Sequence, residues 1–195
     1  MVKIPSRLGD PEPQFSVRGH AAKTLWKAAA ASLAIVFLAS VARIFRLRIS
    51  LTDSAAAPGI YRVVPGVPIH DGDLIAACLP APIATEGLSR GYLKRGDCPG
   101  KTEPVAKVAG ALPGDLVNVQ AQSVSVDGVA FANSATATHD SKGRELSHVP
   151  WGRRVVRAGE VWLFGFNDPR SWDARYFGPV PISAICGVLK PVVTW

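Results

Sequence analysis

The chain of 195 residues is poor in cysteine, methionine and acidic residues. It has three cysteines and one methionine, and it lacks a Cys-x-x-Cys motif, so no ligand spacing typical of a structural zinc site occurs. Its 15 acidic residues are outnumbered by 22 basic ones, which gives a formal net charge of +7. Hydrophobic residues make up 48% and charged residues 19%, a balance that excludes disorder as the main state. The length suits one domain with an appendage and excludes a large multidomain enzyme.

Long apolar runs are also absent, with one exception near the N-terminus. Residues 28–42 are uncharged and mostly apolar between Lys27 and Arg43, and apolar neighbours extend the run to 25–47. A helix of this length approaches the roughly 30 Å of hydrocarbon in a bilayer. It has no polar stripe, which disfavours a surface helix of a soluble core. We therefore expect residues 25–47 to form a membrane anchor.

Two other interpretations of the apolar run stay open. Ser40-Val41-Ala42 has the small-x-small form of a signal-peptide cleavage site, so the run is alternatively a cleaved signal peptide. The second alternative is a helix buried in a soluble core. Five basic residues precede the run and three follow it, which favours a cytoplasmic N-terminus, although only mildly.

From residue 49 onward the sequence is typical of an all-β domain. Short apolar runs with β-branched residues are broken by Gly, Pro, Asp and Asn every 8 to 12 residues. Asp127-Gly128 is a strong turn signal and predicts a hairpin. The polar residues 133–153 are expected to form a long surface excursion. The predicted strands are 59–64, 73–78, 105–111, 116–120, 123–126, 129–131, 160–164 and 182–188.

The three cysteines suggest one disulfide if the β-rich body is exported. Cys78 and Cys98 flank a polar segment, whereas Cys186 lies in the apolar run 182–188. In an oxidising compartment Cys78 and Cys98 are the natural pair, and Cys186 is then a buried thiol. Three reduced cysteines are the alternative.

Two segments contain a residue suited to nucleophilic catalysis. Ser54 precedes three alanines, so an extended peptide can approach its hydroxyl. Lys107 stands alone in the apolar run 105–111. Burial disfavours the ammonium form of a lysine, and the neutral amine can then act as the base that a serine hydroxyl needs. The plainer interpretations are a serine in a turn and a lysine on an edge strand that reaches solvent.

A third segment, 164–180, is densely polar between two apolar runs. It contains Ser171, Asp173 and Arg175, and an ion pair between the last two would be structural. Polar groups packed this closely must find partners if they are covered.

Together the three segments resemble the bacterial signal peptidase I clan, most closely the TraF-type peptidases of conjugative plasmid transfer. The resemblance covers about residues 25–195. It rests on the order of the apolar anchor, Thr-x-Ser with Pro-Gly-Ile-Tyr, Cys-Pro-Gly, the lysine run, Pro-Gly-Asp, and Ser-x-Asp-x-Arg-Tyr-Phe-Gly-Pro-Val. It implies a mainly β, signal peptidase I-like catalytic domain preceded by one N-terminal transmembrane helix. Residues 1–24 would be a cytoplasmic tail, 25–47 a single-pass anchor in the bacterial inner membrane, and 48–195 a periplasmic peptidase domain.

The resemblance also assigns roles to individual residues. Ser54 matches the nucleophile and Lys107 the general base of a Ser/Lys dyad. Thr52 matches the hydroxyl of the oxyanion hole, in which the Ser54 backbone N–H would be the other donor. Ser171 matches a serine that orients the lysine. The family chemistry requires neither a metal nor another cofactor.

Asp173 and Arg175 match the acidic and basic positions of the last motif, where we expect the aspartate to fix the arginine and hence the loop that carries Ser171. Two departures from general signal peptidases stand out. Pro58 lies four residues after the serine instead of three. The last motif opens with Gly165-Phe-Asn-Asp instead of Gly-Asp-Asn, so its backbone turn is expected to differ.

The implied function is that of a membrane-anchored serine endopeptidase that processes a pilin precursor for the mating pilus. The acyl-enzyme would be resolved by water, or by the N-terminus of the substrate to give a cyclic pilin. The expected partners are the pilin precursor or a preprotein, the lipid bilayer and the conjugative transfer machinery. A general signal peptidase I and a catalytically silent pilus-assembly factor are the alternatives. Nucleic acid is not an expected partner, because the arginines at 153, 154 and 157 are typical of a solvated loop.

Overall fold

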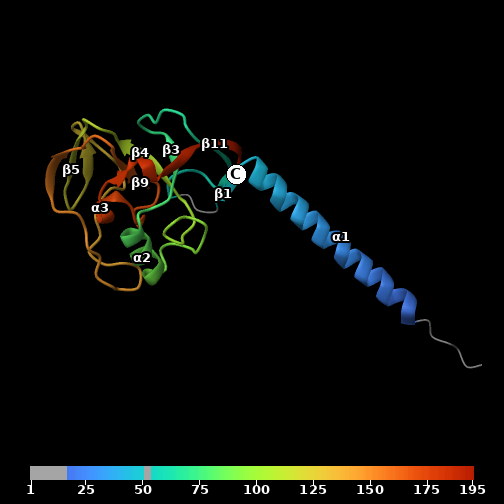
Figure 1. Ribbon diagram of the computed structural model, residues 1–195. Helices are drawn as coiled ribbons and strands as arrows, with labels where there is room; N and C mark the ends of the chain where they lie inside the picture. The colour runs from blue at the N-terminus through green and yellow to red at the C-terminus, as the bar shows by residue number, and fades with distance from the viewer. Residues whose placement is uncertain (1–16, 51–53) are drawn as a thin grey trace, which may run out of the picture. The chain divides into compact units, whose positions relative to one another are not determined.

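The computed structural model describes residues 17–50 and 54–195, and the chain divides into two compact units, Met1–Arg43 and Ile44–Trp195 (Figure 1). Helix α1, Val17–Ile44, lies in the first unit except for its last residue. Its segment Leu25–Ile44 has a mean hydropathy of 1.8 and buries none of its residues within the chain. Length and composition therefore suit a membrane span, and the anchor over 25–47 stays a prediction.

Helix α1 ends at Ile44, before the end of the apolar run. Arg46 has a φ of 52°, a left-handed conformation that an α-helix cannot continue through. Leu47 is the first residue of strand β1, Leu47–Ser50. The last residues of the run therefore belong to the β-rich unit.

Residues 44–195 are mainly β, as predicted. Their strands form two antiparallel sheets, with the orders β1-β2-β11-β3-β4-β9-β10 and β7-β6-β5-β8. The further strands are β2 (Gly59–Val64), β3 (Leu74–Ala77), β4 (Val105–Ala111), β5 (Leu116–Val119), β6 (Val124–Val126), β7 (Val129–Ala130), β8 (Gly152–Val155), β9 (Glu160–Phe164), β10 (Val180–Pro181) and β11 (Ile185–Thr194). The helices are α2 (Ala81–Arg90), α3 (Ala174–Phe177) and a 3₁₀ turn (Ile182–Ala184).

The predicted strands agree with the structure where turn chemistry is strong. Strands β2, β4 and β9 have the predicted bounds, and the predicted hairpin is formed by β6 and β7. Asp127 and Gly128 both have positive φ, 49° and 85°, as a two-residue hairpin turn requires.

Several elements differ from the prediction, among them the unpredicted short elements β1, β10 and α3. The run 182–188 is a 3₁₀ turn followed by β11, which continues to Thr194. Strand β8 begins at Gly152, inside the predicted surface excursion, because it pairs with β5. Helix α2 was not predicted. It has a proline in its first turn and ends at Gly91 with a left-handed φ of 75°, both ordinary helix boundaries.

Strand β9 of the larger sheet packs against residues of both sheets. Its side chains alternate between two hydrophobic clusters, as they must in a pleated strand. Trp162 and Phe164 pack with residues of β5 and β6, whereas Val161 and Leu163 pack with residues of β3 and β4. Each of these large side chains is at most 1% exposed, and burying one stabilises the fold by about 1.5–3 kcal/mol. The end of β9 is therefore a rigid origin for the loop that follows it.

The Cys78–Cys98 disulfide is present, which confirms the predicted pair. It ties the end of β3 to the loop between α2 and β4. Cys186 is a free thiol, as predicted, but it is half-buried instead of fully buried.

The excursion after β7 is ordered against helix α2 by a polar network. Asp140, whose side chain is 6% exposed, accepts hydrogen bonds from Tyr92 Oη at 2.6 Å and from Arg144 Nε at 2.7 Å. Arg144 Nη2 in turn donates to the carbonyl oxygen of Arg90 at 2.8 Å. The Tyr92 hydroxyl, with further help from Arg144, holds the pKa of Asp140 below its ordinary value.

We predict that Asp140→Asn lowers the free energy of unfolding at neutral pH and that this effect fades in acid. The pKa of Asp140 is lowered in the folded chain, so its contribution is present above the ordinary carboxyl pKa and is lost as the pH falls toward the folded value. Urea unfolding of variant and wild type between about pH 7 and about pH 3 measures the difference.

The control for this experiment is Asp97→Asn, which removes an exposed carboxylate outside the network. A stability difference between the Asp140 variant and wild type that stays constant over the whole pH range would contradict the prediction.

Candidate active site

A groove of about 950 Å³ is lined by residues of the larger sheet and by irregular segments. Its floor includes Tyr61 of β2, Ala76 of β3, Ala106 of β4 and Leu189 of β11, which pack together as a small apolar cluster. The groove therefore offers a long apolar floor, and its walls come from irregular segments. Three of the predicted site residues line it: Ser54, Lys107 and Ser171.

Ser54 is half-buried at the start of the described segment that leads into β2. Its carbonyl oxygen accepts a hydrogen bond from the backbone N–H of Asn167 at 3.2 Å. Three residues later, the carbonyl oxygen of Ala57 accepts from Tyr61 Oη at 2.6 Å. The segment is thus held on one side by the loop after β9 and on the other by β2. Thr52, the predicted oxyanion-hole residue, lies outside the described residues.

Lys107 is in the middle of the sheet and not on an edge. Strand β4 lies between β3 and β9, and the side chain of Lys107 is 7% exposed. Its Nζ donates a hydrogen bond to Ser171 Oγ. The interpretation as a lysine that reaches solvent from an edge strand is therefore wrong.

The surroundings of Lys107 favour the neutral amine. Burial lowers the pKa of Lys107, because removing an ammonium from water is costly. Nearby charges act in both directions: Asp173 and Asp168 raise this pKa, and Arg175 lowers it, but the effect of burial is the largest. A lysine with a lowered pKa is more readily neutral, and the neutral amine can accept a proton from a hydroxyl.

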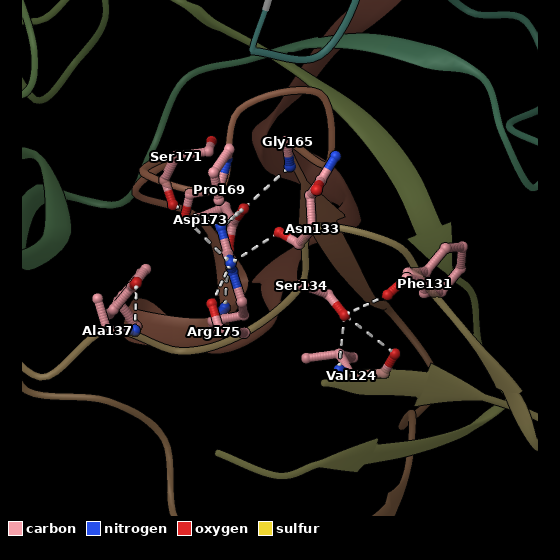
Figure 2. Close-up of polar contacts among 12 residues, drawn as sticks. Val124, Phe131, Asn133, Ser134, Ala137, Gly165, Pro169, Ser171, Asp173 and Arg175 are labelled. Carbon is pink, nitrogen blue, oxygen red and sulfur yellow. Dashed lines mark hydrogen bonds and ion pairs between the residues drawn. The ribbon is translucent and has the colours of Figure 1, made fainter. Parts of the chain in front are cut away.

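Asp173 and Arg175 form the predicted ion pair, and both side chains are fully buried. Figure 2 shows the arginine at the centre of a set of backbone contacts. Its Nε and Nη2 donate to the two carboxylate oxygens of Asp173 at 2.8 and 2.9 Å. Asp173 accepts from the backbone N–H of Gly165 at 2.9 Å, and Arg175 donates to the carbonyl oxygen of Ser171 at 2.8 Å. The pair therefore fixes both ends of the 165–171 loop.

The same arginine fixes a second segment. Its Nη1 donates to the carbonyl oxygen of Ala135 at 2.6 Å (Figure 2). Ala135 and Thr136 line the groove, so part of the excursion that the sequence predicted to be surface is a groove wall. No local pattern could have indicated this, because the contact spans 40 residues of sequence.

Gly165 allows the loop and the Ser54 segment to approach each other. A Cβ atom at position 165 would overlap Ser171 Oγ and would lie 2.9 Å from the carbonyl oxygen of Ser54. A side chain at the first position of the last motif would not fit in this space, and glycine avoids the overlap. Sequence reasoning used Gly165 to align the motif but did not assign it this role.

A metal site does not emerge from residues 17–50 and 54–195. Among these residues, no three His, Cys, Asp or Glu side chains are grouped so that they could hold an ion.

Residues 21–195 match the family described as signal peptidase, peptidase S26, and the chain belongs to this family. The motif resemblance is thereby confirmed.

Several relatives are conjugal transfer proteins. "Conjugal transfer protein TraF" of Agrobacterium fabrum is 36% identical over 150 residues, which cover 76% of this chain and 82% of the relative. "Probable conjugal transfer protein TraF" of Sinorhizobium fredii is 38% identical and covers 76% and 77%. "Plasmid transfer protein TraF" of Escherichia coli is 31% identical and covers 83% and 91%. Among solved structures, a signal peptidase I from Enterococcus faecalis matches 64% of this chain and 98% of its own, with 24% identity and a TM-score of 0.38.

We predict that Gly165→Ala lowers kcat/KM by about 10²-fold, because the added methyl group must push Ser171 or the Ser54 segment away from its position. The measurement is the cleavage rate of a precursor substrate by the full-length chain in detergent, together with thermal unfolding. The control is Gly66→Ala. Gly66 has a left-handed φ of 72° with open space around it, so this variant introduces backbone strain without a clash at the groove. Equal activity losses in the two variants would refute the steric role of Gly165.

We further predict that kcat/KM rises with pH through the lowered pKa of Lys107 and reaches a plateau below about pH 10, where an ordinary lysine titrates. Asp168 is one of the charges that raise this pKa. Asp168→Asn is therefore expected to move the rising limb to lower pH, whereas Asp97→Asn is expected to leave it in place. A limb that stays in the ordinary lysine range would show that Lys107 is not the titrating base.

Proposed function

We propose that the chain is a membrane-anchored serine endopeptidase with a Ser54/Lys107 dyad that processes a pilin precursor during conjugative plasmid transfer. The observation that carries the proposal is the buried Lys107, whose lowered pKa makes it a base, in the same groove as Ser54. Membership of the signal peptidase family and the names of the TraF relatives support the reaction class and the biological setting.

The proposed reaction begins with neutral Lys107. Its Nζ accepts the proton of Ser54 Oγ while this oxygen attacks the carbonyl carbon of the scissile peptide bond. The hydroxyl of Thr52 and the backbone N–H of Ser54 would stabilise the negative oxygen of the tetrahedral intermediate. Protonated Lys107 then donates to the departing amine, which leaves an acyl-enzyme on Ser54.

The remaining residues of the motif have supporting roles in this proposal. Ser171 bonds to Lys107 Nζ and would aim the amine. Asp173 and Arg175 would keep Ser171 and Gly165 in place through their backbone contacts. A buried pair of this kind is sensitive to the loss of one partner, which generally costs about 3–5 kcal/mol.

The shape of the groove suits an extended peptide with small side chains next to the scissile bond. Ala55 and Ala56 line it beside Ser54, and Ala76 and Ala106 contribute to its floor. The methyl groups at these positions form an apolar surface for small substrate side chains. They offer no charged group that could pair with a charged substrate residue. The acyl-enzyme would then be resolved by water, or by the amino terminus of the substrate to give a cyclic product.

The proposed location is the bacterial inner membrane, with residues 1–24 in the cytoplasm, a single span within 25–47, and residues 48–195 in the periplasm. Two observations support it. The helix Leu25–Ile44 is long and apolar enough to cross a bilayer and buries none of its residues within the chain. The Cys78–Cys98 disulfide fits an oxidising compartment such as the periplasm.

We predict that Ser54→Ala and Lys107→Ala each lower processing of a co-expressed pilin precursor by at least about 10²-fold, because each removes one member of the dyad. The controls are Ser147→Ala and Lys142→Ala, which change the same residue types at exposed positions that do not line the groove. Intact mass of the pilin measures both the extent of cleavage and the form of the product.

Each outcome of this experiment is informative. A wild-type product one water lighter than the linear fragment would indicate cyclisation, and a linear product would indicate hydrolysis. Cleavage of a general preprotein but not of the pilin would favour a general signal peptidase I. Unchanged processing in both dyad variants would remove the peptidase assignment and leave a pilus-assembly role.

A further inference from the structure

Three sulfur atoms gather at the junction of β3 and β11. Cys78 follows β3 and is bonded to Cys98, and the Sγ of the free Cys186 lies 3.4 Å from the Sγ of Cys78. The backbone N–H of Cys78 donates to the carbonyl oxygen of Ala184 at 2.8 Å, which keeps the two strands together at this point. The register of β3 and β11 shifts between Ile185 and Gly187, where Cys186 lies.

This arrangement distinguishes the two sulfur atoms of the disulfide. Cys186 contacts Cys78, and both residues are half-buried. Cys98 is only 4% exposed. In thiol–disulfide exchange a thiolate attacks one sulfur atom and displaces the other. The geometry therefore presents Cys78 as the sulfur atom to be attacked and Cys98 as the leaving group.

The disulfide holds a segment that contributes to the groove. Residues 91–104 form a loop whose base is closed by a hydrogen bond from the Glu103 N–H to the carbonyl oxygen of Lys94 at 3.0 Å, and both of these residues line the groove. At the tip, the Cys98 N–H donates to the carbonyl oxygen of Thr102 at 2.9 Å. The bond to Cys78 is a covalent cross-link between the tip of this loop and the end of β3.

We propose that Cys186 is a thiol–disulfide exchange site that moves the cross-link from Cys78–Cys98 to Cys78–Cys186 and thereby releases the groove loop 91–104. The Cys186 thiol gives its proton to water, and its thiolate forms a bond to Cys78 Sγ. The Cys78–Cys98 bond breaks, and Cys98 leaves as a thiolate that takes up a proton. One disulfide and one thiol are present before and after the step, so it needs no oxidant or reductant.

The two cross-links differ in what they restrain. Cys78–Cys98 closes a loop with a sequence separation of 20. Cys78–Cys186 would join β3 and β11, which are already paired by backbone hydrogen bonds. The exchanged form therefore loses a restraint on the groove wall and gains none there, so we expect the part of the loop beyond Tyr92 and Leu93, which have their own contacts, to become more mobile.

The decisive experiment follows the sulfur atoms in the full-length chain without any substrate. Wild type is incubated in detergent, its free thiols are trapped with iodoacetamide, and disulfide-linked peptides are mapped by mass spectrometry after acid quenching. We expect labelled Cys98 to accumulate together with a Cys78–Cys186 peptide. Cys186→Ser is the matched control, and we expect it to yield the Cys78–Cys98 peptide and no labelled Cys98.

The Cys98→Ser variant measures the effect on the groove. Treated with oxidised glutathione, it is expected to form Cys78–Cys186, and amide hydrogen exchange in residues 94–104 is expected to be about tenfold faster than in wild type. Wild type in which iodoacetamide labels Cys186 alone would overturn the exchange. Unchanged hydrogen exchange in oxidised Cys98→Ser would overturn the release of the loop. Neither readout uses peptidase activity, so both are independent of the proposed dyad.

Discussion

The buried ion pair between Asp173 and Arg175 is the interaction on which the site depends. Both side chains are fully buried, and together they bond the backbone at positions 165, 171 and 135. Burying two charges is costly, and it is tolerated when the geometry is good and the remaining hydrogen-bonding groups are satisfied. Here the carboxylate and the guanidinium meet through two hydrogen bonds, and their other polar atoms bond to the backbone. A pair of apolar residues would fill the same space but would leave these backbone groups without partners.

The ion pair is compatible with a neutral Lys107 but is not the main cause of its lowered pKa. An isolated ammonium in the middle of a sheet would be strongly disfavoured, and burial is the main reason that the pKa of Lys107 is lowered. Asp173 opposes the effect and Arg175 adds to it, so the two members of the pair act on the amine in opposite directions. The pair therefore fixes the loop beside Lys107, and burial remains the largest influence on the pKa of its amine.

The sequence predicts those features that short-range rules determine. Short apolar runs between turn residues predicted the strands, and Asp127-Gly128 predicted the hairpin. The lone Lys107 in an apolar run marked a candidate base, and its role in catalysis stays a prediction. The missed features are determined by contacts between distant residues. The wall at Ala135 and Thr136 is polar in composition, and only a bond from Arg175, 40 residues away, makes it part of the groove. The role of Gly165 has the same origin, because the atoms that a Cβ would meet belong to Ser171 and Ser54.

The walls of the groove are held differently from its floor. The floor is regular sheet, which hydrogen bonds and apolar packing stabilise along its length. The walls are irregular segments without a strand ladder, and each has a specific tie. Arg175 holds positions 135 and 171, the Asp140 network holds the excursion after β7, and the Cys78–Cys98 bond holds the loop before β4. These ties are local and chemically distinct, so breaking one can free its own segment while the sheet stays folded. A protein built in this way can change the width of its groove without moving Lys107, which is held by the sheet.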